Sequence, residues 1–111
     1  MHKEIHEQPI AINKTLFHTQ QQIHEMPVDF TNVSRLSIIA CGTSFYAAMV
    51  AKYWFEQFAQ IPVDVDIASE FRYRQPIMAK DGISIFISQS GETADTLAAI
   101  NYANSKFQKT I

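Results

Sequence analysis

One stretch constrains the fold of this chain more than any other: residues 83–97, ISIFISQSGETADTL, run from an apolar segment through a polar loop into a helical pattern. The apolar segment 83–87 is short and rich in β-branched residues, which is typical of a buried parallel strand. A helix is predicted to begin near Glu92. Because the first N–H groups of a helix lack intrahelical partners and its dipole is positive there, the stretch predicts a site for an anion such as phosphate.

The polar loop carries hydroxyl groups and no cation. Ser88, Ser90 and Thr93 place hydroxyls around the predicted helix start, and no lysine or arginine lies among residues 88–93. A phosphate held here would be bound by dipoles and hydroxyls rather than by a point charge. The alternative is that Ser90 or Thr93 is simply an N-cap, a common use of these residues. Glu92 would be repelled by a phosphate and is predicted to point into solvent.

Size and composition limit the classes of protein to which the chain can belong. With 111 residues, 47% of them hydrophobic, it can form one domain with a real core. The formal charge is −2 and the basic residues are scattered, so nucleic acid is not an expected partner. Neither the uncharged stretch between Arg35 and Lys52 nor the amino end resembles a membrane span or a secretory signal. A single cysteine, Cys41, excludes an internal disulfide, and we expect a cytoplasmic protein.

The amino-terminal residues form an arm that precedes the first strand. Residues 2–22 are mostly helix formers with a sparse apolar stripe, which predicts a helix packed on another part of the protein. Pro9 predicts a kink or a restart of this helix. Residues 26–31, which include Pro27 and Asp29, are predicted to be a linker. The stripe consists of Ile5, Ile12, Leu16 and Ile23.

The arm also contains histidines. His2 and His6 are four residues apart and could share a helix face as metal ligands, but no third ligand is placed beside them. A solvated helix face is therefore the preferred interpretation, and we predict neither a metal site nor a cofactor. The remaining histidines are His18 and His24.

The rest of the chain alternates strand and helix. Strands are predicted at 35–40, 63–67 and 83–87, and helices at 44–59 and from about residue 92 onward. Apolar and acidic residues alternate in 63–67, which predicts an edge strand with one face partly wet. Residues 68–74 are either a surface turn with exposed charges or a segment in which Glu70 and Arg72 contact a ligand or a second subunit. Another strand is expected to begin at residues 110–111.

A helical period places an apolar stripe on one face of each long helix. In the first helix the stripe consists of Ala47, Val50, Ala51, Trp54 and Phe58. In the second helix the stripe is expected to face inward and consists of Leu97, Ile100, Ala103 and Phe107.

The order of elements predicts an α/β fold with a parallel sheet and right-handed crossovers. If the first strand is central, with the second strand on one side and the third on the other, the chain reverses direction between the first and third strands. Ligands bind at such a switch point, outside the carboxyl ends of the strands. The turn at 41–44 and the loop at 88–93 would meet there, which favours an anion site over simple capping. Dinucleotide and P-loop glycine motifs are absent from the sequence, so we favour a smaller phosphorylated ligand.

These residues resemble the sugar isomerase (SIS) domain family. Within it, the chain is similar to the first SIS half of the glutamine–fructose-6-phosphate aminotransferases (isomerising), the glucosamine-6-phosphate synthases. The loop SQSGET is shared by SIS domains generally, whereas the other stretches point to the synthases. The matching stretches are KEIHEQP (3–9), ACGTS (40–44), KYWFE (52–56), PVDVDIASEFRYR (62–74) and SQSGETADTL (88–97).

The resemblance implies roles for matching positions in a sugar-phosphate site. The hydroxyls of Ser44, Ser88, Ser90 and Thr93 would hold the phosphate, assisted by the backbone around Gln89. Thr43 and the backbone of Cys41 and Gly42 would lie near the sugar. The implied ligand is fructose 6-phosphate or glucosamine 6-phosphate, and none of these positions is implied to be catalytic.

The resemblance also implies that parts of the synthases are missing here. We expect an arm and linker at 1–31 and a partial three-layer α/β/α SIS domain, flavodoxin-like and incomplete at its carboxyl end, at 32–111. No counterpart of the glutaminase domain or of the second SIS half is present, so the chain would bind sugar phosphate for amino sugar biosynthesis and need a complementary SIS fragment for chemistry. A noncatalytic sugar-phosphate sensor and an inactive remnant are the alternatives. Exposed sheet edges and helix faces also predict a homo-oligomer or poor solubility.

Overall fold

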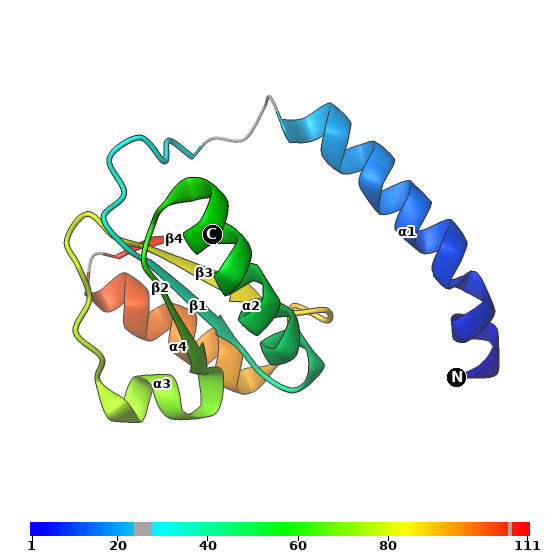
Figure 1. The fold of residues 1–111 in the computed structure, drawn as a ribbon. Helices are drawn as coiled ribbons and strands as arrows, with labels where there is room; N and C mark the ends of the chain where they lie inside the picture. The colour runs from blue at the N-terminus through cyan, green and yellow to red at the C-terminus, as the bar shows by residue number, and fades with distance from the viewer. Residues whose placement is uncertain (24–27, 107) are drawn as a thin grey trace. The chain divides into compact units, whose positions relative to one another are not determined.

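The computed structural model describes residues 1–23, 28–106 and 108–111. The chain divides into two compact units, Met1–Phe30 and Thr31–Ile111 (Figure 1). The sequence predictions for His24, for Phe107 and for the first residues of the linker fall outside the described part of the chain.

The first unit contains a single described α-helix, α1 (His2–Gln22). It passes through Pro9 without interruption, so the predicted restart does not occur. An ion pair between Lys3 and Glu7, at 3.7 Å, links two turns on the amino-terminal side of the proline and supports the helix there. Every residue of α1 is exposed, and a solitary helix of this length is marginal in water.

The second unit is built on a four-stranded parallel sheet (Figure 1). The strands are β1 (Leu36–Ala40), β2 (Val63–Ile67), β3 (Ile83–Ile87) and β4 (Lys109–Thr110). Their order in the sheet is β2-β1-β3-β4. The condition stated above, that β1 is central with β2 on one side and β3 on the other, is therefore met. The predictions that β2 forms an edge and that a further strand begins near residue 110 are confirmed.

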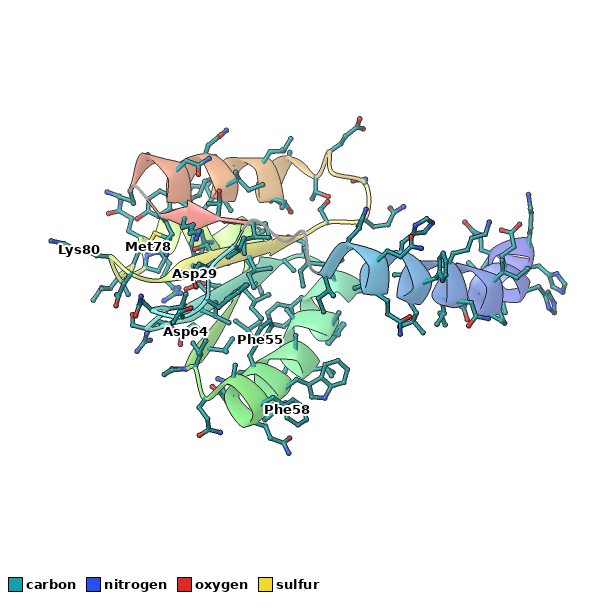
Figure 2. All side chains as sticks on the ribbon, turned by 90° about the horizontal axis from the view of Figure 1, so that it is seen from above. Asp29, Phe55, Phe58, Asp64, Met78 and Lys80 are labelled. Atoms are coloured by element: carbon teal, nitrogen blue, oxygen red, sulfur yellow. The ribbon has the colours of Figure 1, made fainter. Side chains whose placement is uncertain are left out.

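Helices cover both faces of the sheet and give three layers, as predicted (Figure 2). On one face lies α2 (Thr43–Trp54), which continues as a π-helical turn, η2 (Phe55–Ala59). On the other face lie α3 (Ala68–Arg74) and α4 (Ala94–Ser105). The interpretation of 68–74 as a surface turn is wrong, because this segment is helical; its Glu70 and Arg72 are nevertheless exposed.

A compact aromatic and aliphatic cluster joins the sheet to α3 and α4. It contains Ile39 of β1, Ala68 and Phe71 of α3, and Ala99 and Ala103 of α4. Phe71 is 2% exposed and makes edge-to-face contacts with the rings of Phe86 and Tyr102, at centroid distances of 6.2 and 5.8 Å. Such contacts add to the stabilisation from burial alone, so Phe71 anchors α3 on the sheet.

The two long helices bury stripes that match the predicted ones only in part: Ala103 of α4 is buried, as predicted. On α2 the buried residue is Ala48, whereas Val50, Trp54 and Phe58 of the predicted stripe are exposed. The π-helical turn after Trp54 adds a residue to each turn and ends the 3.6-residue period on which the stripe was based. On α4 the buried residues are Thr96, Ala99 and Ala103, while Leu97 is 45% exposed, contrary to the prediction that it faces inward.

Two ion pairs connect the edge strand β2 to neighbouring segments. Arg35 Nη1 donates to Asp64 Oδ2 at 2.6 Å, and Arg74 at the end of α3 donates to Asp66. The hydrogen bond to Asp66, followed by its negative charge, raises the pKa of Arg74 above its ordinary value. Arg74 therefore links the end of α3 to the edge strand β2 through Asp66. Because its side chain is largely solvated, the pair contributes little beyond fixing geometry.

Truncation of Phe71 tests the packing of α3. Phe71→Ala is expected to lower the free energy of unfolding by about 3–5 kcal/mol, because it removes a buried ring and leaves a cavity. The matched control is Tyr73→Ala, two residues away and 69% exposed, for which a change within about 0.5 kcal/mol is expected. Urea denaturation followed by circular dichroism measures both. Equal effects of the two substitutions would contradict the placement of Phe71 in the core.

Candidate functional site

The register of β1 and β3 brings the two polar turns of the sequence together. Ala40, the last residue of β1, lies opposite Ile87, the last residue of β3. The chain leaves these neighbouring strands at the same edge of the sheet, entering residues 41–44 in one case and residues 88–93 in the other. This edge is where ligands of open parallel sheets bind.

Hydroxyl groups converge in the loop after β3. Thr93 Oγ1 lies 3.5 Å from Ser88 Oγ and 3.5 Å from Ser90 Oγ. The N–H of Gly91 donates to Ser88 Oγ at 3.1 Å, and the N–H of Glu92 donates to Ser90 Oγ at 3.2 Å. Because the two serine oxygens already accept from the backbone, their O–H groups can donate to an outside acceptor. Gln89, between them, is exposed.

The amino end of α4 lacks a side-chain cap. Thr93 occupies the N-cap position, but its side chain makes no capping hydrogen bond. Ser90 instead accepts from Glu92, which precedes the helix. Neither Ser90 nor Thr93 therefore caps α4 with its side chain, which was the alternative considered from the sequence. The helix starts at Ala94, two residues later than predicted, so both hydroxyls belong to the loop in front of it.

The turn after β1 leads into α2 in a similar way. Gly42 is the N-cap residue of α2, with φ 58° and ψ −135°, a conformation that favours glycine, and no side chain caps the helix there. Thr43 is exposed and Ser44 is half-buried. Cys41 is half-buried and packs against the cluster around Ile39, as a small apolar side chain would.

The charges near this corner are negative. Residues 41–44 and 88–93 contain no lysine, arginine or histidine. Glu92 is exposed, as predicted. Sequence reasoning overlooked Asp95, a half-buried carboxylate in the first turn of α4, although acidic residues are favoured at that position. The corner therefore provides hydroxyl and N–H donors for an anion, but the nearby carboxylates would repel it.

A separate hollow of about 560 Å³ lies beside β2, away from the two turns. Its polar lining includes Asp64, Asp66 and Arg74, together with Ser37 and Lys52. Asp64 is paired with Arg35 and Asp66 with Arg74, so the charges of these side chains are already compensated and do not attract an anion or a cation into the hollow. The hydroxyl-lined corner is therefore the better candidate site for an anion.

Other kinds of site find no support in the described residues. Within them, no three or more His, Cys, Asp or Glu side chains lie where they could share a metal ion. The rings of His2 and His6 lie 4.5 Å apart between centroids and are tilted by 52°, without a further ligand from the described chain. None of the helices described is both long and apolar enough to traverse a lipid bilayer.

The fold and the corner together define a parallel α/β protein with its candidate site at the carboxyl edge of the sheet. Residues 29–111 match the SIS domain, and the chain belongs to the SIS domain family.

Individual relatives show which members of the SIS family this chain resembles. The chain is 52% identical over 118 residues to a glutamine–fructose-6-phosphate aminotransferase (isomerizing) of Bradyrhizobium diazoefficiens, covering 100% of this chain and 19% of the relative. It is 54% identical over 112 residues to the protein of that name from Brucella abortus, covering 96% and 18%. The chain thus spans about a fifth of the length of the curated relatives it matches. Among solved structures, it resembles the C-terminal domain of glucosamine-fructose-6-phosphate aminotransferase from Francisella tularensis, with a TM-score of 0.81 and 40% identity, covering 100% of this chain and 32% of that chain.

Gly42 provides a test of the turn geometry. A Cβ at this position would meet no atom within 4 Å, so any effect of Gly42→Ala comes from the backbone conformation and not from a clash. We expect Gly42→Ala to lower the free energy of unfolding by about 1–3 kcal/mol. Thermal and urea unfolding measure the change. A variant as stable as the parent chain would show that the turn does not require the observed conformation.

Proposed function

We propose that the corner formed by residues 41–44 and 88–93 binds the phosphate group of a sugar phosphate, either fructose 6-phosphate or glucosamine 6-phosphate. The observation that carries the proposal is that the hydroxyls of Ser88 and Ser90 converge on Thr93 Oγ1 in front of a helix that has no side-chain cap. The family and the names of the relatives support the same class of ligand.

The phosphate would be held mainly by hydroxyls and backbone N–H groups. Ser88, Ser90 and Thr93 would each donate to a phosphate oxygen, while Ser44 would approach from the turn after β1. The N–H groups at the start of α4 and the backbone around Gln89 would add further donors. Each hydrogen bond to a charged acceptor contributes about 1.5–3 kcal/mol, compared with about 0.3–1 kcal/mol from an exposed helix dipole. The hydroxyls are therefore the larger contribution.

The sugar would extend from the phosphate toward the turn after β1. Thr43 is exposed there and can hydrogen-bond a sugar hydroxyl, and the backbone of Cys41 and Gly42 would lie alongside. Gly42 also leaves open space where a side chain would stand. A compact monosaccharide phosphate suits this arrangement.

Chemistry would need groups from outside these two turns. Isomerisation of a ketose to an aldose requires a base and an acid close to the protons that move, each poised near neutral pH. The turns supply hydroxyls and amides, and Glu92 is exposed beside the proposed phosphate site. We therefore propose that this chain supplies sugar-phosphate binding in amino sugar biosynthesis and requires a complementary SIS segment for reaction. A purely sugar-phosphate-sensing role is the second candidate, favoured by the same lack of a base in the turns.

Calorimetric titration with glucosamine 6-phosphate tests the binding. We expect saturable binding that weakens at least about tenfold in Thr93→Val, because the variant keeps the shape of the side chain and loses a hydrogen bond to a charged group. Thr15→Val on α1, which removes a hydroxyl far along the sequence, serves as the matched control and should bind like the parent chain.

Two comparisons make the titration decisive. Glucosamine without phosphate should give no saturable signal at the same concentrations. The proposal fails if glucosamine 6-phosphate shows no saturation at millimolar concentration, or if Thr93→Val binds as tightly as Thr15→Val.

A separate assay addresses the reaction. With fructose 6-phosphate as substrate, we expect no aldose 6-phosphate from this chain alone, because its binding turns contain no base poised near neutral pH. Product should appear only when a second SIS segment of a relative is added. Turnover by the purified chain alone would show that an acid and a base exist within it.

A further inference from the structure

The outer edge of β2 has backbone groups that face away from the sheet. β2 is the last strand on its side of the sheet, so its outer edge has no neighbouring strand among the described residues (Figure 1). The N–H of Leu36 donates to the carbonyl of Pro62 at 2.9 Å, which fixes the phase of the parallel ladder between β1 and β2. In such a ladder every second residue of a strand turns its N–H and C=O toward the same neighbour. The residues of β2 whose backbone groups face outward are therefore Val63, Val65 and Ile67.

Side-chain carboxylates occupy two of these three outward N–H groups. The N–H of Val63 donates to Glu56 Oε1 at 3.2 Å, and the N–H of Ile67 donates to Asp66 Oδ1 at 3.0 Å. Within the part of the chain that the structure describes, the N–H of Val65 makes no hydrogen bond. Charged side chains are one means by which proteins protect edge strands from pairing. Here they protect both ends of β2 and leave its middle residue open.

The open position lies in a hollow. Val65 is half-buried and lines the hollow of about 560 Å³ beside β2. The lining comes from both helical layers, with Lys52 of α2 on one side of the sheet and Phe71 and Arg74 of α3 on the other. Ile77, in the segment after α3, also lines the hollow and is fully exposed. An approaching backbone therefore finds room beside Val65 and an uncovered apolar side chain to contact.

We propose that the outer edge of β2 at Val65 binds a short extended segment of another protein as an added antiparallel strand. In an antiparallel pair, one residue exchanges both of its backbone hydrogen bonds with the single residue opposite. The N–H and C=O of Val65 face the same way, so one partner residue satisfies both. Because the N–H groups at 63 and 67 are occupied, the pairing covers about three residues, or ~10 Å. This is strand addition at a sheet edge, and it does not depend on the proposed sugar-phosphate site.

Charge defines the segment that fits. The charged side chains around the hollow form three pairs, Asp64 with Arg35, Asp66 with Arg74 and Lys52 with Glu56. Paired charges do not select an acidic or a basic segment, whereas a charged segment would bury a group without a partner. The fitting segment is therefore uncharged, with an apolar residue opposite Val65, since residues directly opposite share a face of the sheet.

The same charges argue against a second copy of β2 as the added strand. If two β2 strands paired antiparallel with Val65 opposite Val65, Asp64 of each copy would lie opposite Asp66 of the other. Like charges directly opposite one another destabilise a strand pair. An uncharged segment of a different protein avoids this repulsion.

Nuclear magnetic resonance titration with a capped pentapeptide, Thr-Thr-Val-Thr-Thr, tests the proposal. We expect the amide signal of Val65 to shift and saturate, and its hydrogen exchange to slow. Methylation of the nitrogen of the peptide's central valine removes the donor to the Val65 carbonyl and should weaken binding at least about fivefold. The protein is unchanged in this comparison, so its folding does not affect the result. Equal binding of the two peptides, or no saturable shift with either, would overturn the proposal.

Two protein variants change the edge in opposite directions. Val65→Pro removes the outward N–H at a position where an edge strand tolerates proline, and should weaken binding at least about fivefold. Glu56→Ala frees the N–H of Val63 and should strengthen binding about twofold or more. The matched control is Glu70→Ala, which removes an exposed carboxylate of α3 and should bind like the parent chain. Circular dichroism checks that the variants fold. The proposal is wrong if Glu56→Ala binds the peptide no more tightly than Glu70→Ala does.

Two further results would assign the edge to another occupant and so contradict the proposal. Slower exchange of the Val65 N–H at rising protein concentration, without peptide, would show that a second copy covers the edge. Saturable shifts of the same amide with free threonine and valine would show that the hollow is a site for small molecules.

Discussion

The pairing of β1 with β3 is the constraint on which the candidate site depends. These strands are parallel and in register, and β1 is almost completely buried between its neighbours. A slip of one residue would turn Ile39 from the cluster around Phe71 to the opposite face. It would also move one polar turn relative to the other by about 3.3 Å. Core packing and the geometry of the corner are therefore fixed by the same register.

If the proposed function is correct, the corner binds an anion without help from a cation. Its donors are neutral, and the nearby Glu92 and Asp95 make the local field unfavourable. Affinity must then come from short, directed hydrogen bonds, which are lost if a hydroxyl moves by an ångström, rather than from long-range attraction. For the proposed site, the geometry of the loop, in which backbone N–H groups donate to Ser88 and Ser90, would matter more than its charge.

Much of this arrangement follows from the sequence, because strand–turn–helix patterns are strong local signals. The strand order entered the sequence argument only as a condition, because it depends on long-range pairing. The side of α2 that meets the sheet could not be predicted, since apolar residues surround the helix and the π-helical turn after Trp54 disrupts the period. The sequence left open whether 68–74 is a helix or a turn, because the stability of this helix comes from Phe71 in the core and not from a pattern of its own. The uninterrupted helix at Pro9 shows that a proline inside a helix, beyond its first turn, need not end it. The resemblance to SIS domains assigned residue roles that geometry alone would not have assigned.

Whether the two turns act as one site is tested most directly by mapping backbone amide shifts with nuclear magnetic resonance while glucosamine 6-phosphate is added. If the corner is a single site, the amides of residues 42–44 and of residues 88–95 shift together and saturate with one dissociation constant. If only one of these segments shifts, if the two saturate at different concentrations, or if the shifts lie around the hollow beside β2, the central claim is wrong.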